Sequence, residues 1–218
     1  MFIGHFAVAF AAKRAAPSVS LGTLFVACEL VDLVWPVFVL LGIETVRIAP
    51  GSTAFTPLEF IHYPWTHSLL MCAAWSALFG FGYSLVRKNF RAAIVVAAVV
   101  LSHWFLDALV HRPDLPLVPG GAARIGLGLW NSVAATLVVE GLMFAAGVFV
   151  YLRTTRAKDR VGAIGLWVLV IFLLMAYAAA AFGPPPPNAQ AVAWAGIVGG
   201  TVTALWGYWV DRHREVLR

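Results

Sequence analysis

The sequence predicts an all-α fold: a polytopic membrane helix bundle of about six transmembrane helices plus a short N-terminal helix that dips into the membrane. Of the 218 residues, 61% are hydrophobic and only 11% are charged, whereas soluble proteins carry about 25% charged residues. The mean hydropathy is +0.87. Six apolar stretches reach the roughly 20 residues that a helix needs to cross a bilayer. We therefore expect residues 1–218 to form a single membrane domain.

The short N-terminal helix is expected within MFIGHFAVAFAAKR. Its apolar run of about 11 residues is too short to cross a bilayer. Lys13 and Arg14 follow this run, whereas the positive charges of a secretory signal peptide precede the apolar region. The segment is therefore expected to enter the membrane or to pack against the bundle.

The predicted spans cover residues 21–43, 67–86, 91–111, 129–151, 162–182 and 190–210. Basic residues alternate between the loops that connect them. Twelve of the fifteen occur before span 1, in the second and fourth loops and in the tail: Lys13, Arg14, Arg87, Lys88, Arg91, Arg153, Arg156, Lys158, Arg160, Arg212, Arg214 and Arg218. The other loops hold Arg47, Arg112 and Arg124. The positive-inside rule then predicts that both termini are cytoplasmic.

The net charge of +5 comes from basic residues in these short loops, where membrane topology accounts for them. We therefore expect no nucleic-acid partner. The two cysteines, Cys28 and Cys72, lie inside apolar runs and are interpreted as ordinary buried thiols.

Three short motifs carry the ionisable residues of the first three spans. CELVD places Glu29 and Asp32 in the first span, HYPWTHS leads into the second, and SHWFLDALVH ends the third. Residues four apart share one face of a helix, so His103 and Asp107 should point the same way. If the third span runs outward, these motifs can meet in one cavity that opens to the outer side of the membrane.

Buried carboxylates inside a membrane are costly unless they are paired, and no Lys or Arg lies within a span core. A divalent cation, most simply zinc, would offset the charge and would explain the histidines. The candidate ligands for one or two ions are His5, Glu29, Asp32, His62, His67, His103 and Asp107. We expect His67, His103 and Asp107 at the centre of the site, with His111 exposed or behind the ligands.

The second half of the chain, residues 115–218, has few ionisable residues within its spans and is expected to be a scaffold for residues 1–114. Its exception is Glu140, near the middle of the fourth span. Two interpretations of Glu140 stay open from sequence: it joins the site, or it forms a hydrogen bond to a neighbouring helix.

These motifs resemble those of the bacterial YdjM-like family, whose members are membrane proteins with a predicted metal-dependent hydrolase activity. The resemblance rests on His5, the acidic pair in ELVD, the His-to-His spacing in HYPWTHS, and SHWFLD, and it covers about residues 1–114. The family pattern has Arg-Gly where this chain has Tyr63-Pro64, so Arg112 is the candidate replacement for an anion-binding arginine. The resemblance implies a location in the bacterial inner membrane.

Three functions are compatible with these residues. The first is a metal-dependent hydrolase that acts on a lipid or lipid-linked phosphoester from the outer side, with Glu29 or Asp32 as general base and with Arg112 and His111 contacting the substrate. The second is a cation- or proton-coupled transporter that uses the same residues. The third is a structural protein in which a metal only stabilises the fold. Sequence alone favours the hydrolase and leaves the oligomeric state open.

Overall fold

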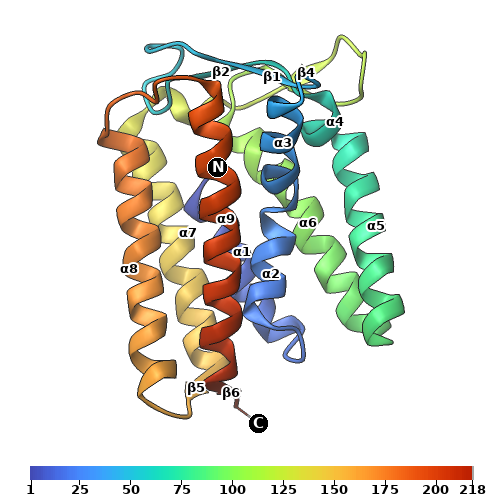
Figure 1. Ribbon diagram of the computed structural model, residues 1–218, viewed down its shortest axis with the longest axis vertical. Helices are drawn as coiled ribbons and strands as arrows, with labels where there is room; N and C mark the ends of the chain where they lie inside the picture. The colour runs from blue at the N-terminus through green and yellow to red at the C-terminus, as the bar shows by residue number, and fades with distance from the viewer. Residues whose placement is uncertain (218) are drawn as a thin grey trace.

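The computed structural model describes residues 1–217 and is a bundle of long helices (Figure 1). Five helices are long and apolar enough to cross a membrane. They are α5 (Leu69–Arg87), α6 (Phe90–Val110), α7 (Val133–Thr154), α8 (Arg160–Phe182) and α9 (Ala189–Arg212). Each agrees with a predicted span to within four residues at either end. The prediction of an all-α polytopic bundle is confirmed.

The remaining predicted span, residues 21–43, is divided into two helices. Helix α2 (Leu21–Cys28) and helix α3 (Leu30–Leu40) meet at Glu29 with a bend of 53°. The break leaves the Cys28 carbonyl oxygen free to accept a hydrogen bond from His103 Nδ1 (2.7 Å). Irregular backbone at membrane depth is tolerated where it lines a cavity or is buried in protein, and Glu29 and Asp32 do line a cavity.

The short N-terminal helix forms as predicted, as α1 (Ile3–Ala15), and it lies inside the bundle behind α9 (Figure 1). Its contact with α7 is close because residue 147 is a glycine: a Cβ atom there would lie 2.3 Å from the Ala7 carbonyl oxygen. Small residues at such crossings let membrane helices approach each other. Most of α1 is buried as a result, including His5 and Lys13.

Three short antiparallel two-stranded sheets, absent from the sequence prediction, lie at the two ends of the bundle. At one end, β1 (Thr45–Ile48) pairs with β2 (Leu58–His62), and β3 (Leu115–Pro116) pairs with β4 (Arg124–Ile125). Helix α4 (Pro64–His67) and a 3-10 turn, η1 (Leu129–Asn131), lie in the same connections. At the other end, β5 (Thr155–Ala157) pairs with β6 (Arg214–Val216).

The basic regions gather at the end that holds β5 and β6 (Figure 1). Lys13 pairs with Asp211 (2.7 Å), Ser18 Oγ accepts a hydrogen bond from Asn89 Nδ2 (3.3 Å), and the Lys158 amide donates to the His213 carbonyl oxygen (2.9 Å). Arg218, the last residue of the predicted basic tail, lies outside the described residues.

The first residues of the chain lie inside the bundle, and only the last turn of α1 reaches the basic end. Helix α1 runs from the interior of the bundle toward the basic end, so Lys13 and Arg14 mark its exit. The Met1 amino group lies inside the bundle and donates a hydrogen bond to Asp107.

Candidate metal centre

Five of the seven predicted ligands meet inside the bundle, from four different helices. His5 comes from α1, Asp32 from α3, His67 from α4, and His103 and Asp107 from α6. They form two groups whose ligand atoms lie within 4.8 Å of one another: Asp32, His67 and His103, and His5, His103 and Asp107. All but Asp32 are buried, and Asp32 is half-buried.

The spacing of these donor atoms is close to that of a metal site. In the first group, Asp32 Oδ1 lies 3.0 Å from His67 Nε2, and Asp32 Oδ2 lies 3.7 Å from His103 Nε2. Asp107 Oδ2 lies 3.1 Å from His103 Nε2 and 3.8 Å from His67 Nε2. Ligands held about 2.0–2.2 Å from a tetrahedral zinc ion lie about 3.3–3.6 Å apart. The observed separations fall on either side of that range.

The protonation of His103 follows from its other ring nitrogen. Nδ1 lies 2.7 Å from the Cys28 carbonyl oxygen, which can only accept a hydrogen bond. Nδ1 therefore carries a proton. In the neutral ring, Nε2 is unprotonated and its lone pair is directed at Asp32 and Asp107. His103 Nε2 is also a buried side-chain nitrogen without a hydrogen-bond partner among the described residues.

His67 is fixed in the same tautomer through Thr66 and Glu44. The Glu44 carboxylate is buried and accepts hydrogen bonds from the Trp65 amide (2.8 Å), the Thr66 amide (3.0 Å) and the Thr66 hydroxyl (2.7 Å). The Thr66 hydroxyl has a single proton, so it must accept from His67 Nδ1, which lies 2.6 Å away. His67 Nε2 is then the unprotonated nitrogen, and it faces Asp32.

Two imidazole lone pairs thus face two carboxylates, and all four groups are acceptors. They are mutually repulsive unless a cation lies between them or the imidazoles take up a second proton. Neutral imidazole held by a hydrogen bond on its other nitrogen is the usual form of a histidine metal ligand. Asp32, His67 and His103 supply three protein ligands, as in catalytic zinc sites, which keep the fourth position open. The residues therefore fit a divalent ion.

His5 extends the cluster on the side of α1. Its ring stacks on that of His103, with centroids 3.8 Å apart, and its Nε2 lies 3.2 Å from Asp107 Oδ1. Because His103 has one free nitrogen, it can serve only one ion, and a second ion would depend on His5 and a carboxylate shared between the two. Glu29 belongs to neither group, although it lines the same cavity as Asp32.

Besides Glu29, His62 is the other predicted ligand that lies outside the two groups. It is the last residue of β2 and is exposed. The five-residue spacing to His67 crosses from a strand into a helix, so the two side chains share no face. His111, expected to be exposed or behind the ligands, is 2% exposed and lines the cavity.

Arg112 lies in an ion-pair network at the outer edge of the site. Its guanidinium contacts Asp114 (3.0 Å) and Glu59 (3.3 Å). Asp114 also accepts hydrogen bonds from the Tyr63 hydroxyl (2.9 Å) and contacts His111 Nδ1 (2.9 Å). Burial alone would raise the pKa of Asp114, but these hydrogen bonds hold it below its ordinary value. Arg112 is not among the residues that line the cavity.

Glu140 supports the site from outside it. Its carboxylate is fully buried and accepts hydrogen bonds from the Phe2 amide (2.8 Å) and the Gly4 amide (3.1 Å). These are unpaired amide groups at the start of α1. Of the two interpretations left open by the sequence, the hydrogen bond to a neighbouring helix is therefore correct, and it positions the segment that carries His5.

Glu44 and Thr66 are residues that sequence reasoning missed. Glu44 lies 22 residues from Thr66, in a loop beyond the first span, and no periodic spacing connects the two. The only available signal was that Thr66 directly precedes a predicted ligand in HYPWTHS.

The cluster opens into a cavity of about 440 Å³. Glu29, Asp32, His67, Asp107 and His111 form its polar side. Most of the rest is apolar or small, and the largest share comes from α3, α8 and α9, including Leu33, Trp35, Pro36, Phe172, Leu173, Ala176, Ala180, Val192, Ala195, Gly196, Gly199 and Gly200. Helices α8 and α9, predicted as scaffold, therefore line the cavity as well.

Fold and site together define an integral membrane helix bundle with an internal histidine–carboxylate cluster that can hold a metal. The model of the YdjM inner membrane protein family matches residues 1–184. The chain belongs to this family, and the match extends well beyond the 1–114 expected from the motifs. Searches of curated proteins and of solved structures gave no match.

Proposed function

We propose that this protein is a metal-dependent hydrolase that cleaves a lipid or lipid-linked phosphoester. The observation that carries the proposal is the group of Asp32, His67 and His103 donor atoms, two of whose members, Asp32 and His67, line a largely apolar cavity. Its volume of about 440 Å³ is within the range of roughly 300–1,000 Å³ typical of ligand pockets. The proposal includes an inner-membrane location with the basic end in the cytoplasm, so that the site opens toward the outer side.

Asp32, His67 and His103 would hold the ion, with Asp107 beside them. When bound, a divalent ion there supplies Lewis acidity toward a phosphoryl or acyl oxygen and lowers the pKa of a water molecule. The choice of zinc follows from two imidazoles and a carboxylate as ligands.

Glu29 is the proposed general base. Asp32 is engaged with His67 and His103, whereas Glu29 lines the same cavity and belongs to neither ligand group. Glu29 accepts the proton of the attacking water while the bond between phosphorus and the leaving oxygen breaks, and it then returns that proton to the leaving oxygen. The break between α2 and α3 places Glu29 at the bend.

The apolar arm of the cavity fits the tail of a lipid substrate. Gly196, Gly199 and Gly200 on α9 face this arm together with Ala176 and Ala180 on α8. Small side chains leave room between these helices for a hydrocarbon chain. The lipid phosphate would then lie beside Asp32 and His111, at the polar side.

The test is product release from a panel of phospholipids, lipid phosphates and acyl esters presented to the purified protein. We expect metal-dependent product that is lost in Glu29→Gln, which keeps the side-chain shape and removes the basicity, while metal content is retained. Glu215→Gln is the matched control, because Glu215 pairs with Arg156 at the opposite end. Wild-type activity in Glu29→Gln would exclude Glu29 as the base.

One observation favours a second candidate, a cation- or proton-coupled transporter. Broken helices with ionisable groups at the break are typical of ion-coupled transporters, and α2 and α3 form such a pair at Glu29. Flux of protons or divalent ions in proteoliposomes, with no product from any lipid in the panel, would replace the hydrolase proposal with this one.

A further inference from the structure

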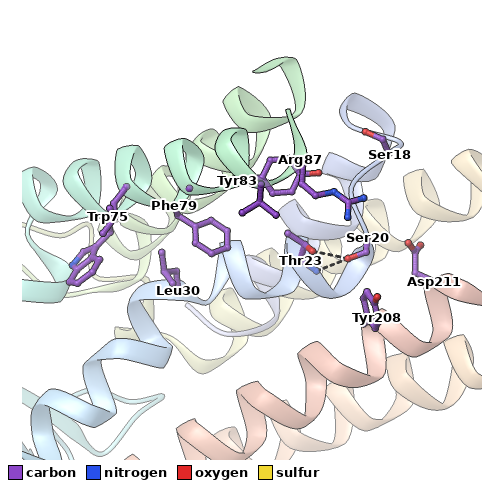
Figure 2. A pocket seen from close by; sticks show the side chains of 13 residues that line it. Ser18, Ser20, Thr23, Leu30, Trp75, Phe79, Tyr83, Arg87, Tyr208 and Asp211 are labelled. Atoms are coloured by element: carbon purple, nitrogen blue, oxygen red, sulfur yellow. Dashed lines mark hydrogen bonds between the residues drawn. The ribbon is translucent and has the colours of Figure 1, made fainter. Parts of the chain in front are cut away.

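A second cavity, of about 740 Å³, lies on the outside of the bundle between α2, α5 and the last turns of α9 (Figure 2). It shares no lining residue with the cavity at the candidate metal centre. The residues around it are Ser18, Ser20, Thr23, Leu30, Trp75, Leu78, Phe79, Gly82, Tyr83, Val86, Arg87, Tyr208 and Asp211. We call it the α2–α5 groove.

The groove is polar at one end and apolar at the other. Arg87 and Ser20 lie at one end, and Leu30, Phe79 and Trp75 follow toward the other (Figure 2). Trp75 and Arg87 are twelve residues apart on α5, which is about 18 Å along a helix at 1.5 Å per residue. One leaflet contributes about half of the roughly 30 Å hydrocarbon core. The groove is therefore long enough for the acyl chain of one leaflet.

The polar end has a net positive charge. The Arg87 side chain has no hydrogen-bond or ion-pair partner among residues 1–217, and Figure 2 shows it pointing toward Ser20. Asp211 is the acidic residue of the groove, but its Oδ2 is 2.7 Å from Lys13 Nζ and its Oδ1 accepts from the Tyr151 hydroxyl (2.8 Å). Lys13 therefore neutralises Asp211 and leaves the charge of Arg87 uncompensated.

Hydroxyl groups next to Arg87 complete a phosphate-binding set. Ser20 Oγ and Thr23 Oγ1 lie 2.8 Å apart, and one of the two donates to the other. The second hydroxyl proton remains free to donate to an anion. Ser18, which is exposed, adds another hydroxyl at the same end.

The side of the groove faces the surrounding lipid. Leu78 is 59% exposed and Val86 is 79% exposed, as expected for residues on the lipid side of a spanning helix. We propose that the α2–α5 groove binds one anionic phospholipid from the leaflet at the basic end of the bundle. Its phosphate contacts Arg87, Ser20 and Thr23, and one acyl chain lies along Phe79 and Trp75. This site is independent of the proposed hydrolase activity.

The test is native mass spectrometry of the full chain in detergent, with phosphatidylglycerol or phosphatidylcholine of the same acyl chains added. We expect one retained phosphatidylglycerol and a preference for it over phosphatidylcholine. Arg87→Gln should reduce that preference about fivefold, the worth of one basic residue near an anionic lipid. Arg91→Gln is the matched control, because Arg91 is an exposed arginine in the first turn of α6, just across the α5–α6 connection from Arg87, and does not line the groove.

Gly82→Leu tests the apolar part without a charge change. A Cβ atom at Gly82 meets nothing within 4 Å, so a leucine fills the groove without moving the helices, and both lipids should be lost. An unchanged preference in Arg87→Gln would overturn the proposal. So would displacement of the lipid by inorganic phosphate alone, or a dimer that Gly82→Leu converts to a monomer without loss of lipid.

Discussion

At the scale of single residues, hydrogen bonds on Nδ1 decide what His67 and His103 can do. The Cys28 carbonyl oxygen accepts a hydrogen bond from Nδ1 of His103, and the Thr66 hydroxyl accepts one from Nδ1 of His67. In the neutral rings, each Nε2 atom therefore has a lone pair that faces a carboxylate. Loss of an outer partner of this kind typically weakens metal affinity by about 10–100-fold. Thr66 and Glu44 therefore act as positioning residues for His67.

Thr66→Val should accordingly weaken zinc affinity by about 10–100-fold. Valine has nearly the shape of threonine but cannot accept a hydrogen bond from Nδ1 of His67. Competition with a chromophoric chelator measures the affinity, and Thr45→Val, an exposed threonine on β1, is the control. Equal affinities for Thr66→Val and the wild type would show that Thr66 does not orient His67.

We expect the ionisation of Asp114, at the outer edge of the site, to make the folded protein less stable in acid. Its pKa is below the ordinary value in the folded protein because of His111, Tyr63 and Arg112. The stabilisation from the ionised carboxylate is therefore complete above the unfolded pKa of about 4 and is lost as the pH falls through the lower folded value. Thermal unfolding in detergent should show a larger drop below pH 4 for the wild type than for Asp114→Asn. Parallel curves would contradict this.

Sequence spacing was informative for residues on one helix and uninformative across the chain. His103 and Asp107 were paired from the four-residue repeat, and the structure places them 3.1 Å apart. His62 was grouped with His67 from proximity in sequence, yet β2 keeps it exposed. Glu44 reaches Thr66 through the fold of the β1–β2 connection, which no local pattern encodes.

At the scale of elements, α1 is held by α7 and by Glu140. Gly147 allows the close contact with Ala7, and Glu140 accepts the amide groups at the start of α1. The helix in turn places His5 against His103 and Asp107. A helix of 13 residues is too short to span the bilayer alone, so its position depends on these contacts.

Gly147→Val should displace α1, because a Cβ atom there would lie 2.3 Å from the Ala7 carbonyl oxygen. We expect a lower melting temperature and a loss of any metal that His5 helps to bind. Gly141→Val is the matched control on the same helix, since a Cβ atom at Gly141 meets nothing within 4 Å. Equal melting temperatures for the two variants would contradict the packing of α1 against α7.

The spans were predictable because their length and hydropathy are set by the bilayer. The break at Glu29 was not, because it accompanies a hydrogen bond between the Cys28 carbonyl oxygen and His103, 75 residues away, which no local pattern encodes. The three two-stranded sheets were also missed, since strands of two to five residues are too short to show a periodic pattern.

At the scale of the whole molecule, the two cavities lie toward opposite ends of the bundle. The metal centre communicates with the end that holds β1 and β2, and the α2–α5 groove lies toward the basic end. In the proposed orientation, with the basic end in the cytoplasm, substrate would enter from the outer side, and the bound phospholipid would come from the inner leaflet.

Reporter fusions test that orientation. Fusions in the β5 connection near residue 157 and after β6 should report the cytoplasm, whereas a fusion near residue 51, between β1 and β2, should report the outer side. The structure places β5 and β6 in one sheet, so their reporters must agree. Outer-side signals at residue 157 and at the C-terminus would reverse the orientation and the assigned access route.

The most direct test of the metal centre is the divalent-metal content of the purified protein after reconstitution with zinc, measured by inductively coupled plasma mass spectrometry. The account predicts at least one tightly held ion in the wild type and in His62→Ala, whose side chain is exposed. His67→Ala and the double variant His103→Ala with Asp107→Ala should each lose it while the helix content stays unchanged. No bound ion in the wild type, or wild-type metal content in the double variant, would contradict the metal centre.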